Sequence, residues 1–255
     1  EKPKGDALKK MKVDTTILGV DPTTASENPY IASMGIYVMS AKALKELLIN
    51  KYPKANDFGN EIIPGAREAG YKVQAFAFEG YWEDIGTIEA FYNCNMALAK
   101  NINAPYSFYD KSAPTVCMSR FLPPTKILSN AVVKDSLLGD GCIIRKNAHV
   151  SGSVIGIRSL IGANSVVEDV MMMGSDFYEK EEDRPNLPGK LLMGVGSGTH
   201  IRRAIVDKNA RIGSNCKLIN QAGVKEASRE EEGWIIKDGI IIIIKDSTIP
   251  NGTVV

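Results

Sequence analysis

Aliphatic residues return every six positions through the second half of this chain. A period of six matches neither an α-helix, which repeats every 3.6 residues, nor an ordinary strand, which alternates every two. It is typical of a left-handed parallel β-helix, in which each hexad forms one face of a triangular coil and directs its aliphatic residue inward. The series runs through Val132, Leu138, Ile144 and Val150, slips by one to Ile155, Ile161 and Val167, returns at Val195 and Ile201, slips again to Val206, Ile212 and Leu218, and ends with Ile243, Ile249 and Val255.

Small or compact residues occupy the fourth place of these hexads. A β-sandwich would instead alternate every two residues, with turns every 8–12 residues. We therefore predict a β-helix with Val132, Leu138, Ile144, Val150, Ile161 and Ile212 inside. Two charged stretches break the period, Gly174–Met193 and Asn220–Asp238, and we interpret them as loops that leave the coil at its corners. The small residues are Ser136, Cys142, Ala148, Ser159, Ser165, Thr199, Ala210 and Cys216.

The first hundred residues alternate short apolar runs with helical stretches, as in an α/β domain. We predict strands at Ile31–Ser40 and Val73–Phe78, and helices at Ala41–Asn50 and Thr87–Lys100. These strands are too few for a complete nucleotide-binding sheet, so we expect the latter part of a larger domain. Prolines at 105, 114, 123 and 124 indicate an extended connector. The predicted division is 1–104 for the α/β part, 105–126 for the connector and 127–255 for the β-helix.

Composition excludes several classes of protein. Thirty-one Lys and Arg residues against 30 Asp and Glu residues leave a net charge of +1, so no overall positive field favours nucleic acid. The longest apolar run, Ile240–Ile244, is far shorter than the roughly 20 residues of a membrane span. Four cysteines without CxxC spacing and two histidines indicate neither a zinc site nor a disulfide framework. Because the chain starts at Glu1 rather than Met and has no targeting pattern, we expect a fragment of a longer protein.

Carboxylates beside aromatic residues mark candidate sugar and metal sites. Asn56-Asp57-Phe58-Gly59 and the stretch Tyr81–Thr87 each place an Asp beside an aromatic ring in a glycine-bounded loop, which suits a sugar. Asp84, just before a helix N-terminus, could bind Mg²⁺ or simply cap that helix. The Glu1-Lys2 pair could hold a hydroxylated phosphate ligand or form a solvated terminus.

These motifs, in their order along the chain, resemble those of plant-type ADP-glucose pyrophosphorylase, the glucose-1-phosphate adenylyltransferase family. The matching segments cover essentially the whole chain: EKPKG, KVDTTILG, IASMGIYV, NDFG, GYWEDIGTIEAFYN, FYD, LPPTK, GIRS, DKNARIG and IKDSTIPNG. The resemblance implies a Rossmann-like nucleotidyltransferase domain followed by a left-handed β-helix. It also implies ATP and glucose 1-phosphate as substrates, ADP-glucose and pyrophosphate as products, Mg²⁺ as cofactor, a heterotetramer of two related subunit types, and a plastid location.

The resemblance also assigns roles to individual residues. The effector site of the family, which binds an anionic phosphate compound, is matched by Arg120, Lys208 and Lys245, and its metal-binding aspartate by Asp84. Lys208 and Lys245 are 37 residues apart, and the Asn220–Asp238 loop takes up half of that interval, so we expect them on adjacent coils. The glucose-1-phosphate site is matched by Glu1, Lys2, Ser33, Tyr37, Asp57, Phe58 and Trp82.

Two departures from the family pattern are visible. Met118 stands where related small subunits often carry Gln, and the N-terminal GGGxGTRLxPLT phosphate loop with a second metal-binding aspartate is not in this chain. We therefore expect the chain alone to be inactive. Two alternatives remain: a non-catalytic regulatory subunit of the same enzyme, or a β-helix acyltransferase using His149 or His200. Both histidines fall where a surface corner is expected, and neither has an evident carboxylate partner in the sequence.

Overall fold

The computed structural model describes residues 5–9, 11–78, 80–100, 104, 106–116 and 118–255. The chain forms two compact units, Glu1–Trp82 and Glu83–Val255. The predicted boundaries at 104 and 126 separate sequence domains instead of these compact units, and they remain predictions. Glu1 and Lys2 lie outside the described residues.

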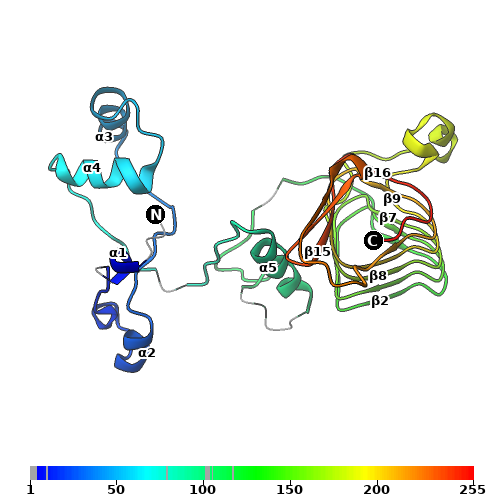
Figure 1. The fold of residues 1–255 in the computed structure, drawn as a ribbon, viewed down its shortest axis with the longest axis horizontal. Coiled ribbons are helices and arrows are strands. Elements are labelled where there is room, and N and C mark those ends of the chain that lie inside the picture. The colour runs from blue at the N-terminus through cyan, green and yellow to red at the C-terminus, as the bar shows by residue number, and fades with distance from the viewer. Residues whose placement is uncertain (1–4, 10, 79, 101–103, 105, 117) are drawn as a thin grey trace. The chain divides into compact units, whose positions relative to one another are not determined.

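The described residues of the first unit form short helices (Figure 1). The predicted helix at Ala41–Asn50 is present as α3 (Ala41–Lys45) continued by the π-helical η2 (Glu46–Lys51). Leu47 of its apolar stripe is buried with Ile62 and Ala66, and this cluster is the core of the unit. The remaining elements are α1 (Gly5–Lys9), η1 (Thr15–Leu18), α2 (Pro22–Glu27), η3 (Phe58–Ile62) and α4 (Ile63–Glu68).

The two strands predicted in this unit are wrong for the described structure. Residues 31–40 and 73–78 have no ladder partner among the described residues. A strand is defined by backbone hydrogen bonds to a neighbour, so an apolar, β-favouring sequence is not enough to form one. Their apolar side chains are correspondingly open, with Val38 99% and Phe76 88% exposed.

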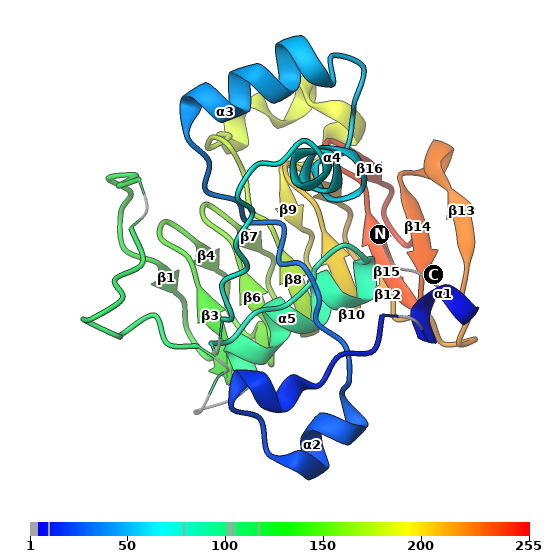
Figure 2. The ribbon, with the colours of Figure 1, turned by 90° about the vertical axis from the view of Figure 1, so that its left-hand side faces the viewer.

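The second unit is the predicted parallel β-helix, preceded by helix α5 (Ile88–Lys100). Its strands stack side by side along the coil in the order β1-β4-β7-β9-β11-β16 on one face (Figure 2). The strands of that face are β1 (Lys126–Ile127), β4 (Ile143–Ile144), β7 (Leu160–Ile161), β9 (Gly194–Val195), β11 (Arg211–Ile212) and β16 (Thr248–Ile249). The others are β2 (Val132–Lys134), β3 (Leu137–Leu138), β5 (His149–Ser151), β6 (Val154–Ile155), β8 (Val166–Met172), β10 (His200–Val206), β12 (Lys217–Leu218), β13 (Ala227–Arg229), β14 (Trp234–Lys237) and β15 (Ile240–Ile243).

One turn of the coil takes 17 residues. Val133 pairs with Val150, and Val150 pairs with Val167, so 150−133 and 167−150 both equal 17. Two sides of the triangle therefore have six residues and one has five. The one-residue slips in the sequence mark this shorter side.

This geometry corrects one predicted core position. The strict period of six places Val132 inside, but the inward residue of the first coil is Val133, which packs against the core, while Val132 is 40% exposed. The error arises because only five residues separate Val133 from Leu138, whereas the prediction counted six residues between consecutive inward positions. Leu138 is half-buried, and the other predicted core residues, Ile144, Val150, Ile161 and Ile212, are at most 1% exposed.

The corners of the coil are turned by residues with positive φ. At one corner these are Asn130, Asn147 and Asn164, again 17 apart, with φ of 56–58°. Asparagine adopts this left-handed conformation more readily than most residues. The amide of Asn147 also donates to the side-chain oxygen of Asn164 at 2.9 Å. The corner within the shorter interval, between Val133 and Leu138 and its equivalents, uses Asp135, Gly152, Asp169, Arg203 and Asn220.

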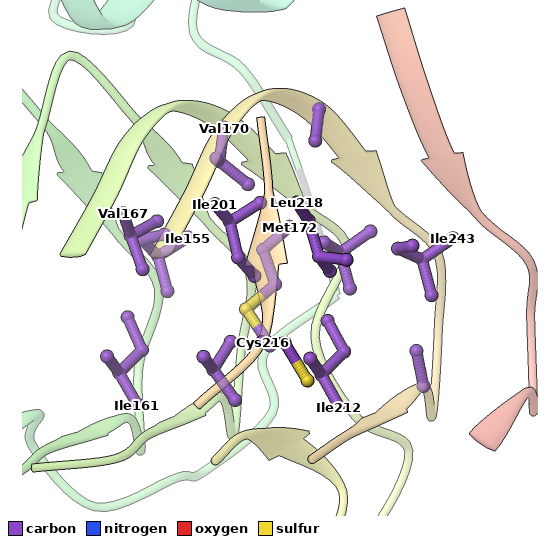
Figure 3. Packing of buried hydrophobic residues seen from close by; sticks show 14 of the residues in the cluster. Ile155, Ile161, Val167, Val170, Met172, Ile201, Ile212, Cys216, Leu218 and Ile243 are labelled. Carbon is purple, nitrogen blue, oxygen red and sulfur yellow. The ribbon is translucent and has the colours of Figure 1, made fainter. Parts of the chain in front are cut away.

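The interior is a column of aliphatic side chains with the sulfur-containing residues Cys142, Met172 and Cys216 among them; Figure 3 labels the last two. The small residues of the repeat are buried beside it and satisfy backbone groups. Ser165 Oγ donates to the Gly196 carbonyl at 2.8 Å, and Thr199 Oγ1 donates to the Gly213 carbonyl at 2.7 Å. Cys94, Cys142 and Cys216 are free thiols.

Helix α5 belongs to the second unit and packs on the outside of this coil. Its Tyr92 and Met96 are buried against Met171, Ile205 and Ile240, which point outward from β8, β10 and β15. The Tyr92 hydroxyl donates to the Asp169 carbonyl at 2.6 Å, and burial raises the pKa of Tyr92 to about 12. The predicted helix at Thr87–Lys100 is thus confirmed.

Both predicted excursions leave the coil at corners. Residues 174–193 contain the 3-10 turns η4 (Glu181–Asn186) and η5 (Pro188–Lys190), drawn in yellow-green beside the coil in Figure 1. Residues 220–238 contain β13 and β14, which pair antiparallel with each other and with β15.

We expect the register correction to appear as a difference in stability between two valines. Val150→Ala should lower the free energy of unfolding of the β-helix by about 2 kcal/mol, because it removes about two buried methylene equivalents. Val132→Ala should lower it by less than about 0.5 kcal/mol, as is usual at exposed positions. Urea unfolding followed by far-UV circular dichroism measures both. Equal losses of unfolding free energy in the two variants would contradict the correction and indicate that Val132 is buried.

Candidate functional site

Four of the predicted sugar-site residues lie together in the first unit. The rings of Tyr37 and Phe58 stack with centroids 5.9 Å apart, and Ser33 Oγ lies 3.2 Å from the Tyr37 hydroxyl. A Cβ added to Gly59 would lie 3.4 Å from Asp57 Oδ1 and 3.7 Å from the Tyr37 hydroxyl oxygen, so these two groups border the same small space. The structure therefore brings together two stacked rings, two hydroxyls and a carboxylate from two segments, 33–37 and 57–58, that lie 20 residues apart in the sequence.

The backbone fixes Asp57 at the start of η3. Asp57 Oδ1 accepts from the Asn60 N–H at 2.7 Å, and Glu61 Oε2 accepts from the Asn56 and Asp57 N–H groups at 2.8 and 3.0 Å. The exchange is reciprocal, as in a capping box, except that the returning carboxylate comes from the fourth helical residue instead of the third. It satisfies the Asn60 N–H and holds the Asp57 carboxylate in one orientation. Tyr37 and Phe58 remain partly open to solvent, at 39% and 37%.

Trp82 and Asp84 belong to the loop before α5. Trp82 is 41% exposed. Asp84 Oδ1 accepts from the Gly86 N–H at 2.9 Å, and Thr87 Oγ1 accepts from the Ala90 N–H at 3.2 Å. Thr87 therefore caps α5, while Asp84 shapes the loop, so the helix-cap alternative for Asp84 is not what the structure has.

Lys208 and Lys245 lie on adjacent coils, as their spacing predicts. Val206 of β10 pairs with Ile243 of β15, and each lysine follows two residues later. The Asp246 N–H donates to the Lys208 carbonyl at 2.9 Å, which continues the register through the corner.

An aspartate that the six-residue period does not mark pairs with Lys208. Lys208 Nζ is 2.6 Å from Asp176 Oδ1, and Asn209 Nδ2 donates to Asp176 Oδ2 at 3.0 Å. The hydrogen bond from Lys208, the one from Asn209, and the charges of Lys208 and Lys245 hold the pKa of Asp176 below its ordinary value. Asp176 is on the 174–193 excursion, whose path off the coil is not set by the six-residue period, so its sequence carries no signal for this contact.

Arg120 is exposed and forms no hydrogen bond or ion pair with another described residue. The connector two residues later reaches the coil, since a Cβ added to Gly141 would lie 3.6 Å from the Leu122 Cβ and against the Tyr178 hydroxyl. Tyr178 is on the same excursion as Asp176. Met118 is 79% exposed.

A buried ion pair fastens the excursion to the coil. Arg211 holds both carboxylate oxygens of Glu179, at 2.6 and 2.8 Å, with side chains only 11% and 6% exposed. Glu179 also accepts from the Met193 N–H at 2.8 Å, where the excursion returns. Burial alone would raise the pKa of Glu179, but the hydrogen bonds from Arg211 and Met193 and the Arg211 charge outweigh it and lower that pKa. This pair, too, is absent from the sequence analysis.

The histidines differ from expectation. His149 begins β5 and His200 begins β10, so both are on strands rather than corners. His200 Nε2 lies 3.1 Å from Glu168 Oε2, so the expectation that it lacks a carboxylate partner is wrong. The pairing arises because β8 and β10 are adjacent in register, which brings together residues 32 positions apart.

The described residues contain no cluster of three or more His, Cys, Asp or Glu side chains that could hold a metal ion. No helix in the described part of the chain has the length and apolar character needed to span a bilayer.

Comparison with known proteins agrees with both parts of the chain. Residues 1–101 match the family described as nucleotidyl transferase, and residues 120–254 match the GLGC left-handed parallel beta-helix domain. The class is therefore a nucleotidyltransferase region followed by a left-handed β-helix.

The chain belongs to the family that carries this GLGC β-helix domain, and its resemblance to glucose-1-phosphate adenylyltransferases is confirmed. It is 53% identical over 257 aligned positions to the glucose-1-phosphate adenylyltransferase small subunit, chloroplastic/amyloplastic, of Triticum aestivum. That match covers 100% of this chain and 54% of the wheat protein, so the chain spans about half the length of that relative.

We expect Glu179→Gln to destabilise the β-helix by about 3 kcal/mol at pH 7, because it leaves the buried Arg211 charge without its partner. A carboxyl with a lowered folded pKa contributes stability above its ordinary pKa and loses it as pH falls toward the lowered value. The difference between wild type and variant should therefore shrink as the pH falls below the ordinary glutamate pKa of about 4.3. Urea unfolding at several pH values measures it.

Glu182→Gln provides the control, because Glu182 is on the same excursion but is 72% exposed in its pair with Lys180. This substitution should change stability by less than about 0.5 kcal/mol. If the two variants behaved alike at neutral pH, the Glu179–Arg211 pair would not be fastening the excursion.

Proposed function

We propose that the chain forms part of a glucose-1-phosphate adenylyltransferase subunit, which makes ADP-glucose and pyrophosphate from ATP and glucose 1-phosphate in starch synthesis. The observation that carries the proposal is the cluster of Ser33, Tyr37, Asp57 and Phe58, in a chain 53% identical to a wheat enzyme subunit of that name. Stacked rings suit the apolar face of a sugar, and the carboxylate and hydroxyls around them suit its hydroxyl groups. The name of the wheat relative favours a small subunit over the alternatives.

In this proposal, the residues of the chain bind and orient glucose 1-phosphate. Asp57 accepts hydrogen bonds from sugar hydroxyls, while Phe58, Tyr37 and Trp82 provide ring surfaces and Ser33 a further hydroxyl. Glu1 accepts a hydrogen bond from a sugar hydroxyl, and the Lys2 ammonium group pairs with the phosphate. A phosphate oxygen of the sugar phosphate then bonds to the α-phosphorus of ATP, and the bond to pyrophosphate breaks. Such transfers depend on positioning and charge neutralisation rather than on covalent chemistry by the protein.

Asp84 would hold Mg²⁺. Magnesium in nucleotide enzymes uses one or two carboxylates together with substrate phosphates and waters, so a single hard oxygen donor fits it. When bound, the ion neutralises charge on the reacting phosphates. The hydrogen bond from Gly86 fixes the Asp84 carboxylate in the loop before α5.

Arg120, Lys208 and Lys245 are proposed to bind an anionic phosphate effector. Two lysines in register on adjacent coils support this, since both can reach one anion from the same side. Further proposals are related subunits in a heterotetramer and a plastid location, supported by the name of the wheat relative.

The experiment that tests the sugar and metal roles uses the full-length subunit carrying this sequence. Lys2→Ala should raise the KM for glucose 1-phosphate at least tenfold and leave the KM for ATP within about twofold, because only a cation facing the sugar phosphate is lost. Asp84→Asn should lower kcat by about 100-fold or more, because it removes a ligand of the Mg²⁺ ion, which neutralises the charge that develops on the reacting phosphates. Steady-state kinetics with each substrate varied separately measures both.

Two results would contradict these roles. Equal effects of Lys2→Ala on both substrates would remove Lys2 from the sugar site, and unchanged kcat in Asp84→Asn would remove the metal role. Lys12→Ala, an exposed lysine in the same unit, is the control for Lys2 and should change neither KM.

The effector role gives a separate prediction in the assembled enzyme. Lys208→Ala and Lys245→Ala should each raise the effector concentration at half-effect several-fold, while activity at saturating effector stays near that of the wild type. Dose–response curves provide the measurement, with Lys217→Ala as the control on a neighbouring strand. An unaltered response in the Lys208→Ala/Lys245→Ala double variant would exclude the site.

A further inference from the structure

We propose that Asp176 is a tethered carboxylate that occupies the Lys208/Lys245 anion site, so that a phosphate ligand binds by displacing it. The inference rests on the proposed effector role of these lysines. It adds a residue that sets how tightly, and how selectively, the site takes an anion.

The contacts of Asp176 are those a bound anion would make. One carboxylate oxygen is 2.6 Å from Lys208 Nζ, the other accepts from Asn209 Nδ2 at 3.0 Å, and the positive charge of Lys245 acts on the same carboxylate. The Asp176 carboxylate thus occupies both the Lys208 ammonium and the Asn209 amide, the cation and the neutral donor at this corner of the coil. A phosphate placed there would compete for these groups and would also face the like charge of Asp176.

Two further acidic groups also oppose the binding of an anion at this corner. Asp207 Oδ1 accepts from the Lys208 N–H at 2.6 Å, and Asp246 Oδ1 accepts from Asn209 Nδ2 at 3.0 Å. Both are on the coil itself, where strand register holds them. Asp176 differs because it is on the excursion and meets the lysine from outside the coil.

The excursion holds Asp176 in place without locking it. Asn209 binds the start of the excursion twice, donating from its backbone N–H to the Gly174 carbonyl at 3.1 Å and accepting from the Asp176 N–H at 2.9 Å. Glu179, three residues further on, is fixed by Arg211. A carboxylate anchored on both sides has a high effective concentration at the lysines.

The exposure of the pair allows displacement. The side chains of Lys208 and Asp176 are 40% and 46% exposed, and ion pairs this open to solvent contribute little stability. A dianion that reaches both lysines can replace the carboxylate, whereas a monoanion gains too little. Asp176 therefore favours phosphate over singly charged anions.

The test titrates the 255-residue chain with inorganic phosphate at constant ionic strength and follows the backbone amide resonances of Lys208, Asn209 and Asp246. Asp176→Asn should lower the phosphate concentration at half-saturation about three- to fivefold, the size expected for loss of one exposed charge contact. It should also reduce the preference for phosphate over chloride. Asp176→Ala, which removes every acceptor, should do the same. Asp183→Asn, on the same excursion but exposed and away from the lysine contact, should match the wild type.

The outcomes separate the two proposals. If Lys208→Gln weakens phosphate binding but neither Asp176 variant tightens it, the anion site stands and the displacement by Asp176 is overturned. If both Asp176 variants weaken binding, Asp176 orients the lysines and the inference is again overturned. If neither the wild type nor the Asp176 variants bind phosphate at these resonances, the effector site and the inference fail together. Sugar-phosphate kinetics are untouched by any of these results.

Discussion

Stacking of identical positions every 17 residues is the constraint on which the second unit depends. Each inward aliphatic residue lies directly above its counterpart in the previous coil, so the core is a column rather than a layer between sheets. The same register applies outside the core. Residues that share a position in successive coils become neighbours whatever their distance along the chain, which is how Lys208 and Lys245 come to lie on adjacent coils. Residues two positions off this register can also meet, as His200 and Glu168 do. In this architecture, a loop can be inserted at a corner without disturbing the coils on either side.

The parts of the structure that follow this register could be predicted from the sequence. The β-helix, both excursions and the adjacency of the two lysines all derive from the six-residue period and its slips. The error at Val132 has the same origin, because a strict count of six does not reveal which side of the first coil has five residues. Contacts made by the excursions could not be predicted. Asp176 and Glu179 reach the coil through the path of a loop, and that path depends on packing rather than on any period in the sequence.

The first unit shows a different limit. Apolar, β-favouring sequence marks Ile31–Ser40 and Val73–Phe78 as strands, yet strands require neighbours with free backbone groups, and the described residues offer none. The family resemblance was the better guide here, since four of the residues it selects, Ser33, Tyr37, Asp57 and Phe58, do lie together. Their positions are set by local features, a capping box and a ring stack, which form without a completed sheet. The family resemblance supplied the choice of these residues, because an Asp beside an aromatic ring is common in loops of many functions.

Helix α5 has a consequence for how the two family segments can be separated. The nucleotidyl transferase match ends at residue 101 and the β-helix match begins at 120, so sequence alone places a boundary between them. Physically, α5 is on the β-helix side of that boundary, because Tyr92 and Met96 cover Met171, Ile205 and Ile240. A polypeptide that starts at residue 120 would leave this apolar strip uncovered and inclined to self-associate. The smallest independently soluble β-helix from this chain should therefore begin before Ile88, inside the segment that sequence comparison gives to the other domain.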